Sequence, residues 1–185
     1  MKHKFHSMPT VRKAQLDFAY AGGSLLGGPY SQVKRVRYPP SGGMLRINMA
    51  PEVKAPADLV VPTRDFGVPP EELFKFALHA AAKTLIKGGQ VYVGCGYGIG
   101  RTGTFIAAMC KLNREVLYLT RRGRGLGDDS LMDPVSEVRE RYLDRAVETT
   151  EQAQFVRGLD LFWVARRIAV RIKPTVVFDK RFYLA

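Results

Sequence analysis

A short apolar run, a glycine-rich loop and the start of a helix follow one another over residues 91–104. The run Val91–Val93 consists of β-branched and aromatic residues, which predicts a strand that ends near Cys95. Three of the five residues between Cys95 and Arg101 are glycines. A strand, a tight loop and a helix N-terminus form an anion site, because unpaired helix N–H groups and the positive end of the helix dipole face the loop. The segment therefore predicts an α/β unit with an anion site at the carboxyl end of its strand.

Cys95 stands at the point of this segment where a thiol loses its proton most easily. The field that holds a phosphate at a helix N-terminus also holds a thiolate. A free cysteine has a pKa of about 8.5, whereas helix N-termini and nearby cations lower it to about 3.5–7.5. Cys95 is therefore a candidate nucleophile placed inside an oxyanion cradle.

The spacing Cys95-x5-Arg101-Thr102 resembles the signature of the cysteine-dependent protein tyrosine and dual-specificity phosphatases. The preceding Val-Tyr-Val strand and the Arg-Thr-Gly start of the helix extend the resemblance. It implies an α/β fold in which helices flank a central, mostly parallel sheet. The sequence departs from the family at Gly94, where the family usually has a histidine that orients the loop and lowers the thiol pKa.

Residues 65–69, Asp-Phe-Gly-Val-Pro, resemble the mobile acid loop of the same family. The leaving oxygen of a phosphate monoester needs a positioned acid to protonate it, which is the role that the resemblance implies for Asp65. The usual Trp-Pro before the acid is replaced by Thr63-Arg64. The competing interpretation is a simple turn, for which Asp-x-Gly is a common sequence.

Residues 146–155 are similar to the family segment that positions the hydrolytic water. Gln152 and Phe155 fall on matching positions, whereas Glu148 stands where a glutamine is expected. The competing interpretation is the start of a surface helix capped by Thr149 or by the threonine that follows it. Both interpretations remain open at this point.

The resemblance implies a role for each site residue. Cys95 would attack phosphorus as a thiolate, Arg101 would pair with two phosphate oxygens, and Asp65 would protonate the leaving oxygen. The Thr102 hydroxyl would hydrogen-bond the thiolate, and Gln152, alone or with Glu148, would orient the water. The residues predicted to bind phosphate are Gly96, Tyr97, Gly98, Ile99, Gly100 and Arg101. This chemistry needs no metal or cofactor, none is predicted, and the three histidines show no ligand spacing.

The substrate predicted first is a phosphotyrosine protein, or a protein phosphorylated on tyrosine and on serine or threonine. The loop interior contains no lysine, which disfavours phosphoinositides. The net charge of +12 favours an acidic or anionic partner, although a solvated basic face would account for it equally. An RNA 5′-phosphatase or triphosphatase with the same chemistry is the second hypothesis, so nucleic acid is a possible but less favoured partner. A phosphate-binding module without turnover is the third.

Length and composition predict one domain over residues 1–185, with 46% hydrophobic residues and no membrane span, and the resemblance implies that this is a phosphatase domain. The first residues lack the apolar core of a secretion signal. The two cysteines, Cys95 and Cys110, cannot form a disulfide framework. Cys110 lies about 12 Å along the predicted helix and is expected to be buried. A working thiolate without disulfides indicates a reducing, cytoplasmic location.

Along the chain, residues 1–45 read as loops around short strands, because glycine pairs recur there. The catalytic core is predicted over residues 60–157, and residues 174–185 read as an edge strand or a docking tail. Residues 59–62 read as a short strand before the acid loop, and residues 123–129 as a loop. Helical periodicity predicts further elements at residues 71–86, at 102–120, from Asp133-Pro134 onward, and from about 150 to 172.

Two rival motifs overlap these features. Gly98-x-Gly100-x-x-Gly103 satisfies the dinucleotide-binding fingerprint, but the acidic residue that should follow the next strand is missing. Asp133-Pro134 matches the acid of the low-molecular-weight phosphatases, which carry their cysteine loop near the N-terminus rather than mid-chain. A helix cap accounts better for Asp133.

Overall fold

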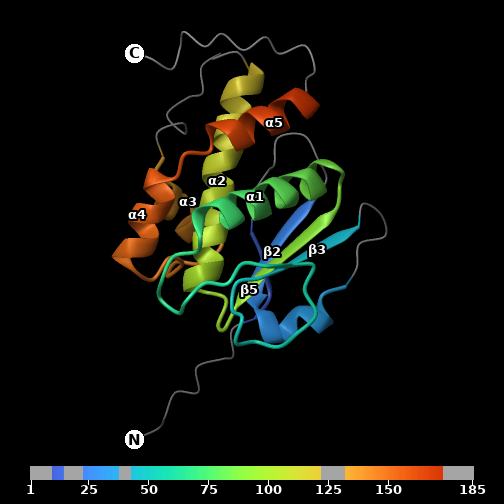
Figure 1. Ribbon diagram of the computed structural model, residues 1–185, viewed down its shortest axis with the longest axis vertical. Helices are drawn as coiled ribbons and strands as arrows, with labels where there is room; N and C mark the ends of the chain where they lie inside the picture. Colours follow the sequence, from blue (N-terminus) through green and yellow to red (C-terminus); the bar gives the residue numbers. More distant parts are fainter. Residues whose placement is uncertain (1–9, 15–22, 38–42, 122–131, 173–185) are drawn as a thin grey trace, which may run out of the picture.

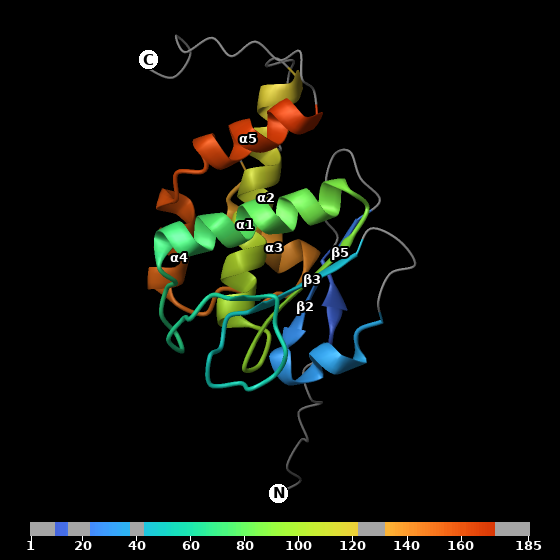
Figure 2. The ribbon, with the colours of Figure 1, turned by 45° about the vertical axis from the view of Figure 1, so that its right-hand side comes forward.

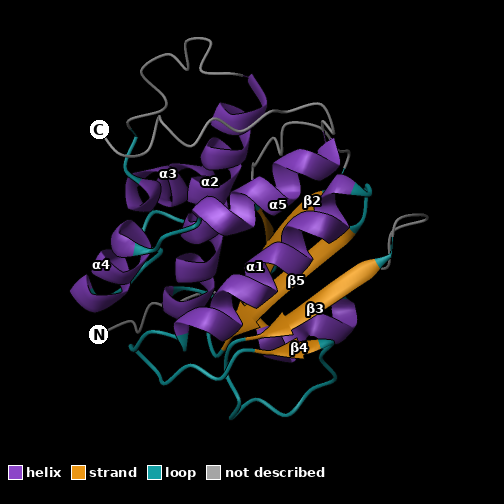
Figure 3. Cartoon of the chain, turned by 45° about the horizontal axis from the view of Figure 1, so that its top comes forward, coloured by secondary structure: helices purple, strands orange, loops and turns teal. Residues whose placement is uncertain are grey.

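The computed structural model describes residues 10–14, 23–37, 43–121 and 132–172, which form a sheet with helices on both faces (Figure 3). The sheet has five strands in the order β1-β2-β5-β3-β4, and β1 alone runs antiparallel to its neighbour. The strands are β1 (Arg12–Lys13), β2 (Ser24–Pro29), β3 (Met44–Asn48), β4 (Leu59–Val60) and β5 (Gln90–Cys95). The predicted α/β fold with a mostly parallel sheet is confirmed.

The α-helices of the described residues lie on one side of the sheet, where α1 and α2 pack against the strands and the other three pack on these two helices or on each other (Figure 1). They are α1 (Glu71–Ile86), α2 (Gly100–Arg121), α3 (Pro134–Arg141), α4 (Thr150–Gly158) and α5 (Phe162–Ile172). The long helix α2 contacts the other four. The 3₁₀ helix η1 (Tyr30–Arg35) covers the opposite face (Figure 2).

Strand β5 occupies the centre of the sheet and alternates between these two layers. Val91 and Val93 face the core beneath the α-helices, whereas Tyr92 packs with Tyr30 and Val33 of η1. This alternation is the period-two pattern of a strand that is covered on both faces. It fixes the orientation of Cys95, which ends the strand and belongs to the α-helical side of the core.

The N-terminal part contains short strands, as predicted, but one glycine pair that was expected to mark a loop lies inside a strand. Gly27 and Gly28 lie inside β2, and the 3₁₀ helix η1 follows the strand directly. Both glycines are there because their neighbours come close: a Cβ on Gly27 would lie 2.8 Å from the ring of Tyr142, and a Cβ on Gly28 would lie 3.1 Å from the Tyr92 hydroxyl. Glycine pairs therefore marked close packing rather than loops here.

The single helix predicted from about 150 to 172 is wrong, because the chain leaves the helix after Gly158. Leu159 has an extended backbone, and the Asp160 carboxylate accepts a hydrogen bond from the N–H of Phe162 at the start of α5. The ammonium of Lys111 donates to the carbonyls of residues 156, 157 and 159, which would otherwise be unpaired at the end of α4.

The remaining predicted elements agree with the structure where it describes them. The helices at 71–86 and 102–120 correspond to α1 and α2, and Asp133 caps α3 by accepting from the N–H of Ser136. The strand predicted at 59–62 is shorter, at Leu59–Val60. The predicted loop at 123–129 and the predicted tail at 174–185 lie outside the described residues. No helix in the described ranges is long and apolar enough to cross a membrane.

Candidate active site

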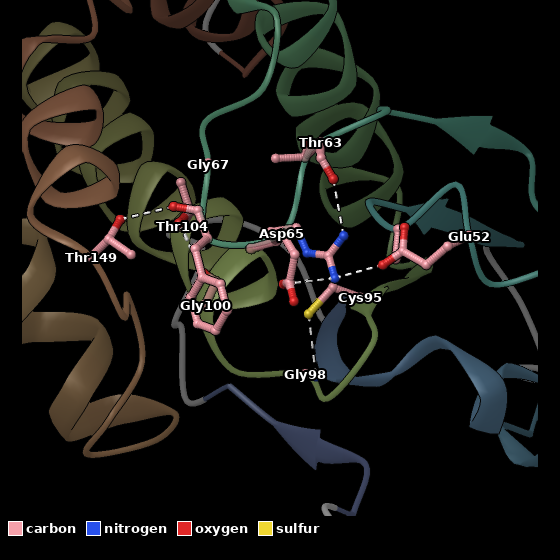
Figure 4. A network of polar contacts seen from close by, with 12 residues as sticks. Glu52, Thr63, Asp65, Gly67, Cys95, Gly98, Gly100, Thr104 and Thr149 are labelled. Carbon is pink, nitrogen blue, oxygen red and sulfur yellow. Dashed lines mark hydrogen bonds and ion pairs between the residues drawn. The ribbon is translucent and has the colours of Figure 1, made fainter.

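Cys95 ends β5 and α2 begins at Gly100, so residues 96–101 comprise the loop between the central strand and the central helix together with the first two residues of that helix. We call these residues the phosphate loop. The Cys95 side chain is buried, and its Sγ accepts a hydrogen bond of 3.3 Å from the backbone N–H of Gly98 (Figure 4). The predicted strand, loop and helix are thus observed, with the sulfur turned toward a loop amide.

Glycines allow the phosphate loop and β2 to approach each other closely. Gly98 has a φ of 75°, in the left-handed region that favours glycine, and its missing side chain would overlap the backbone of Gly28. A Cβ on Gly94 would lie 2.7 Å from the Gly28 carbonyl oxygen and 3.0 Å from the Cα of Tyr30. The departure from the family at Gly94 therefore has a structural cause, since β2 leaves no room for a histidine side chain.

The guanidinium of Arg101 contacts three other residues of the site. Its Nη2 lies 2.7 Å from Oε1 of Glu52 and 3.0 Å from Oδ1 of Asp65. Its Nη1 donates a 2.9 Å hydrogen bond to the carbonyl of Thr63, just ahead of the acid loop. Figure 4 shows Glu52, Thr63, Asp65 and Cys95 gathered around this point, so the structure brings the predicted nucleophile and acid together.

Burial and charge act in opposite directions on Arg101. Burial lowers the pKa of Arg101, but the hydrogen bond to Glu52 and the charges of Cys95, Glu52 and Asp65 outweigh it, and the net pKa is raised. The same hydrogen bond from Arg101 is the main cause that lowers the pKa of Glu52. The site therefore keeps a buried cation beside the sulfur.

Two buried polar atoms of the site have no hydrogen-bond partner among the described residues: Nε of Arg101 and Oγ1 of Thr102. The predicted bond from the Thr102 hydroxyl to Cys95 is thus not formed in this structure. A buried donor without a partner is uncommon and calls for an explanation. Both atoms lie at the start of α2, where the sequence predicts an anion.

Gln152 lies at the start of α4, and its side chain is fully buried. Its Oε1 accepts from the N–H groups of Glu148 and Thr149, and with Thr149 it forms a capping box. Its Nε2 donates to the carbonyl of Gly67 at 3.2 Å, while the Thr149 hydroxyl donates to the carbonyl of Phe66 at 3.1 Å. The segment thus caps a helix, as one interpretation predicted, and also holds the acid loop.

Glu148 lies against the phosphate loop. A Cβ on Gly100 would overlap the Glu148 carboxylate, and Nε2 of Gln152 is the next side chain beyond it. The Glu148 side chain is exposed, whereas the Gln152 amide is enclosed and engaged in hydrogen bonds. The carboxylate is therefore the more accessible polar group at this edge of the loop.

Sequence reasoning missed three contributors to the site. Glu52 and Thr63 contact Arg101 from the segments that follow β3 and β4, and Tyr142 donates a 2.7 Å hydrogen bond to the carbonyl of Gly98. No local pattern marks any of them, because each reaches the site only through the order of the strands or the packing of α3. The nearest signal in the sequence was that Glu52 stands shortly before the predicted acid loop.

Residues 48–113 match the family model described as a polymorphic toxin system DSP-PTPase phosphatase. This range includes Glu52, Asp65, Cys95 and Arg101, and thus the whole Arg101 network.

Two uncharacterised proteins of Methanocaldococcus jannaschii align with 98 residues of this chain. MJ0215 is 35% identical over 53% of this chain and 52% of its own length, and MJECL20 is 34% identical over 53% and 56%. The alignment thus spans about half the length of these curated relatives.

Two solved phosphatases share the fold. Kinase associated phosphatase, with its catalytic-site cysteine replaced by serine, has a TM-score of 0.53 at 15% identity and covers 82% of this chain and 93% of its own. A protein tyrosine phosphatase of Trypanosoma brucei has a TM-score of 0.52 at 14% identity, covering 92% and 75%. These two likenesses concern the fold alone. Residues 48–113, the segment that carries the site, are thus similar to a DSP-PTPase phosphatase, and the described residues share the fold of these two solved phosphatases.

Proposed function

We propose that this protein hydrolyses phosphate monoesters through a cysteinyl-phosphate intermediate on Cys95. The observation that carries the proposal is the buried pair formed by the Cys95 sulfur and the Arg101 guanidinium at the start of α2. The unpartnered Nε of Arg101 supports it, because a phosphate oxygen in the loop would supply the missing acceptor.

In the first step the Cys95 thiolate attacks phosphorus in line with the leaving oxygen, so that an S–P bond forms as the P–O bond breaks. The loop N–H groups and Arg101 hold the charge on the equatorial oxygens. Asp65 donates its proton to the leaving oxygen, which departs as an alcohol or phenol.

Asp65 is paired with Arg101 in the structure. Its carboxyl group is 57% exposed, so this ion pair is weak and easily exchanged. A phosphate dianion in the loop gives Arg101 a more highly charged partner, and Asp65 is then released toward the leaving oxygen. Substrate binding and placement of the acid are coupled in this way.

In the second step water attacks the cysteinyl-phosphate, the S–P bond breaks, and the Asp65 carboxylate takes the proton of the water. The free hydroxyl of Thr102 stabilises the departing thiolate. Gln152 was predicted to orient the water, but its amide is engaged by the capping box and by Gly67. The exposed carboxylate of Glu148 is the second candidate for that role.

The substrate class that we propose is a protein phosphorylated on tyrosine, or on tyrosine and on serine or threonine. Two exposed aromatic side chains border the site, Phe66 beside the acid and Tyr97 in the phosphate loop, with exposed fractions of 57% and 69%. Exposed rings of this kind offer contact area to the aromatic group of phosphotyrosine. The net charge of +12 favours acidic substrates in general, and so leaves RNA 5′-phosphate ends as the second candidate.

The test is hydrolysis of p-nitrophenyl phosphate in the presence of a chelator. We expect turnover by the wild type, none by Cys95→Ser, and a loss on the order of 100-fold in kcat for Asp65→Asn. Vanadate binding without turnover would indicate a phosphate-binding module instead. Comparison of phosphotyrosine peptides, phosphoserine peptides and triphosphate-ended RNA then decides the substrate class.

A further inference from the structure

Tyr142 touches the phosphate loop but has no part in the reaction as described above. It directly follows α3, it is buried, and its hydroxyl donates a 2.7 Å hydrogen bond to the carbonyl of Gly98. The bond joins residues that are 44 positions apart in the sequence. It is therefore a tertiary contact between the helical layer and the middle of the anion cradle.

The ring of Tyr142 is fixed in place by β2. The position of a Cβ on Gly27 would lie 2.8 Å from both Cε2 and Cζ of the ring, so the ring fills the space that this glycine leaves. A side chain at position 27 would push the hydroxyl away from the loop. The strand, the tyrosine and the loop thus form one packed unit.

The hydrogen bond sets the orientation of one loop amide. In a trans peptide the C=O of one residue and the N–H of the next point in opposite directions. Tyr142 draws the Gly98 carbonyl to its own side, so the N–H of Ile99 points to the other side. The N–H of Gly98 itself faces Sγ of Cys95. Because glycine accepts several backbone conformations, the peptide at Gly98 needs an external partner to stay in one of them.

The phenol is suited to act as a permanent donor. Burial is the main cause that raises the pKa of Tyr142, and the charges of Cys95 and Tyr92 raise it further. The hydroxyl therefore keeps its proton and, with it, its hydrogen bond to the Gly98 carbonyl.

We propose that Tyr142 is a positioning residue that holds the Gly98–Ile99 peptide with its N–H toward the bound anion. The proposal rests on the proposed function, since the anion is the phosphoryl group of the substrate. Without the hydroxyl the buried carbonyl of Gly98 loses its donor, the peptide turns, and a carbonyl oxygen faces the anion instead of an N–H.

The test compares Tyr142→Phe with Tyr92→Phe. Tyr92 is a matched control, because it is also a buried tyrosine whose hydroxyl donates to a carbonyl, that of Pro29, outside the phosphate loop. The readout is the rate of Cys95 alkylation by iodoacetate, which is an anion, relative to iodoacetamide, which is neutral. This ratio reports on the anion cradle without any turnover. Vanadate inhibition of p-nitrophenyl phosphate hydrolysis is measured in parallel.

We expect the iodoacetate-to-iodoacetamide ratio and the vanadate affinity to fall about tenfold in Tyr142→Phe, as for partial loss of an oxyanion donor. Tyr92→Phe should keep both at the wild-type level. Unchanged values in Tyr142→Phe, or equal losses in both variants, would overturn the proposal. Absence of anion preference and of vanadate binding in the wild type would overturn the proposed function as well, so the two failures are distinguishable. Circular dichroism of each variant checks that it is folded.

Discussion

The start of α4 holds the acid loop by two hydrogen bonds, and cutting one of them tests whether loop position controls the first chemical step. Thr149 donates to the carbonyl of Phe66, and Gln152 donates to the carbonyl of Gly67. Phe66 has a φ of 59°, a left-handed conformation that costs a residue other than glycine on the order of 1 kcal/mol or more. The loop conformation next to Asp65 therefore depends on outside support.

Thr149→Val removes the hydroxyl and keeps the shape of the side chain. The lost hydrogen bond to Phe66 is worth about 0.5–1.5 kcal/mol, so the equilibrium constant between the held and released forms of the loop falls about 2- to 10-fold. The same hydroxyl also accepts from the N–H of Gln152, and loss of this helix cap lowers the free energy of unfolding by about 1 kcal/mol. Thr149→Ser keeps the hydroxyl and is the matched control.

The assay uses a series of aryl phosphates whose phenols differ in acidity. A misplaced acid matters most when the leaving phenol is weakly acidic, so kcat/KM of Thr149→Val should fall about fivefold for phenyl phosphate and little for a dinitrophenyl phosphate. Thr149→Ser should follow the wild type throughout. A uniform loss across the series would refute the reasoning. A burst of phenol release would also refute the reasoning, because it would show that hydrolysis of the cysteinyl-phosphate had slowed and not its formation.

Three further predictions concern stability. Gly94→Ala places a Cβ 2.7 Å from the Gly28 carbonyl oxygen and should lower the free energy of unfolding by about 1–3 kcal/mol; an unchanged urea midpoint would contradict this. Burial raises the pKa of Glu115 from 4.5 to about 7, so the folded state binds its proton more tightly than the unfolded state. Stability should therefore fall as the pH rises through this window, and Glu115→Gln should flatten the profile. The hydrogen bond from Arg157 lowers the pKa of Asp133 from 3.8 to about 2, and its contribution is lost as the pH falls through that range. Asp133→Asn should thus be less stable than the wild type near neutral pH, with the difference vanishing toward pH 2.

The parts of the fold that local sequence determines could be predicted. β5, the phosphate loop and the start of α2 follow one another without interruption, so glycine content and apolar periodicity identify them. The Asp133 cap can be predicted in the same way, because the carboxylate stands three residues before the residue whose N–H donates to it.

Contacts between distant segments could not be predicted. The partners of Arg101 depend on β3 lying beside β5 and β4 lying beside β3, which no local pattern reveals. Gly27 and Gly28 resemble turn residues in the sequence. The structure requires glycine at these positions because Tyr142 and the phosphate loop, which are far along the chain, pack closely against them. The end of α4 was missed because its last carbonyls are paired by Lys111 of another helix.

The most direct test of the account is to identify the atom that carries the phosphoryl group between the two steps. Asp65→Asn, mixed with p-nitrophenyl phosphate and quenched in acid within milliseconds, should yield a phosphate adduct on the peptide that contains Cys95, as read by mass spectrometry. The adduct should disappear in Cys95→Ser and in the presence of vanadate. Turnover without any adduct on Cys95, or turnover by Cys95→Ser, would contradict the account.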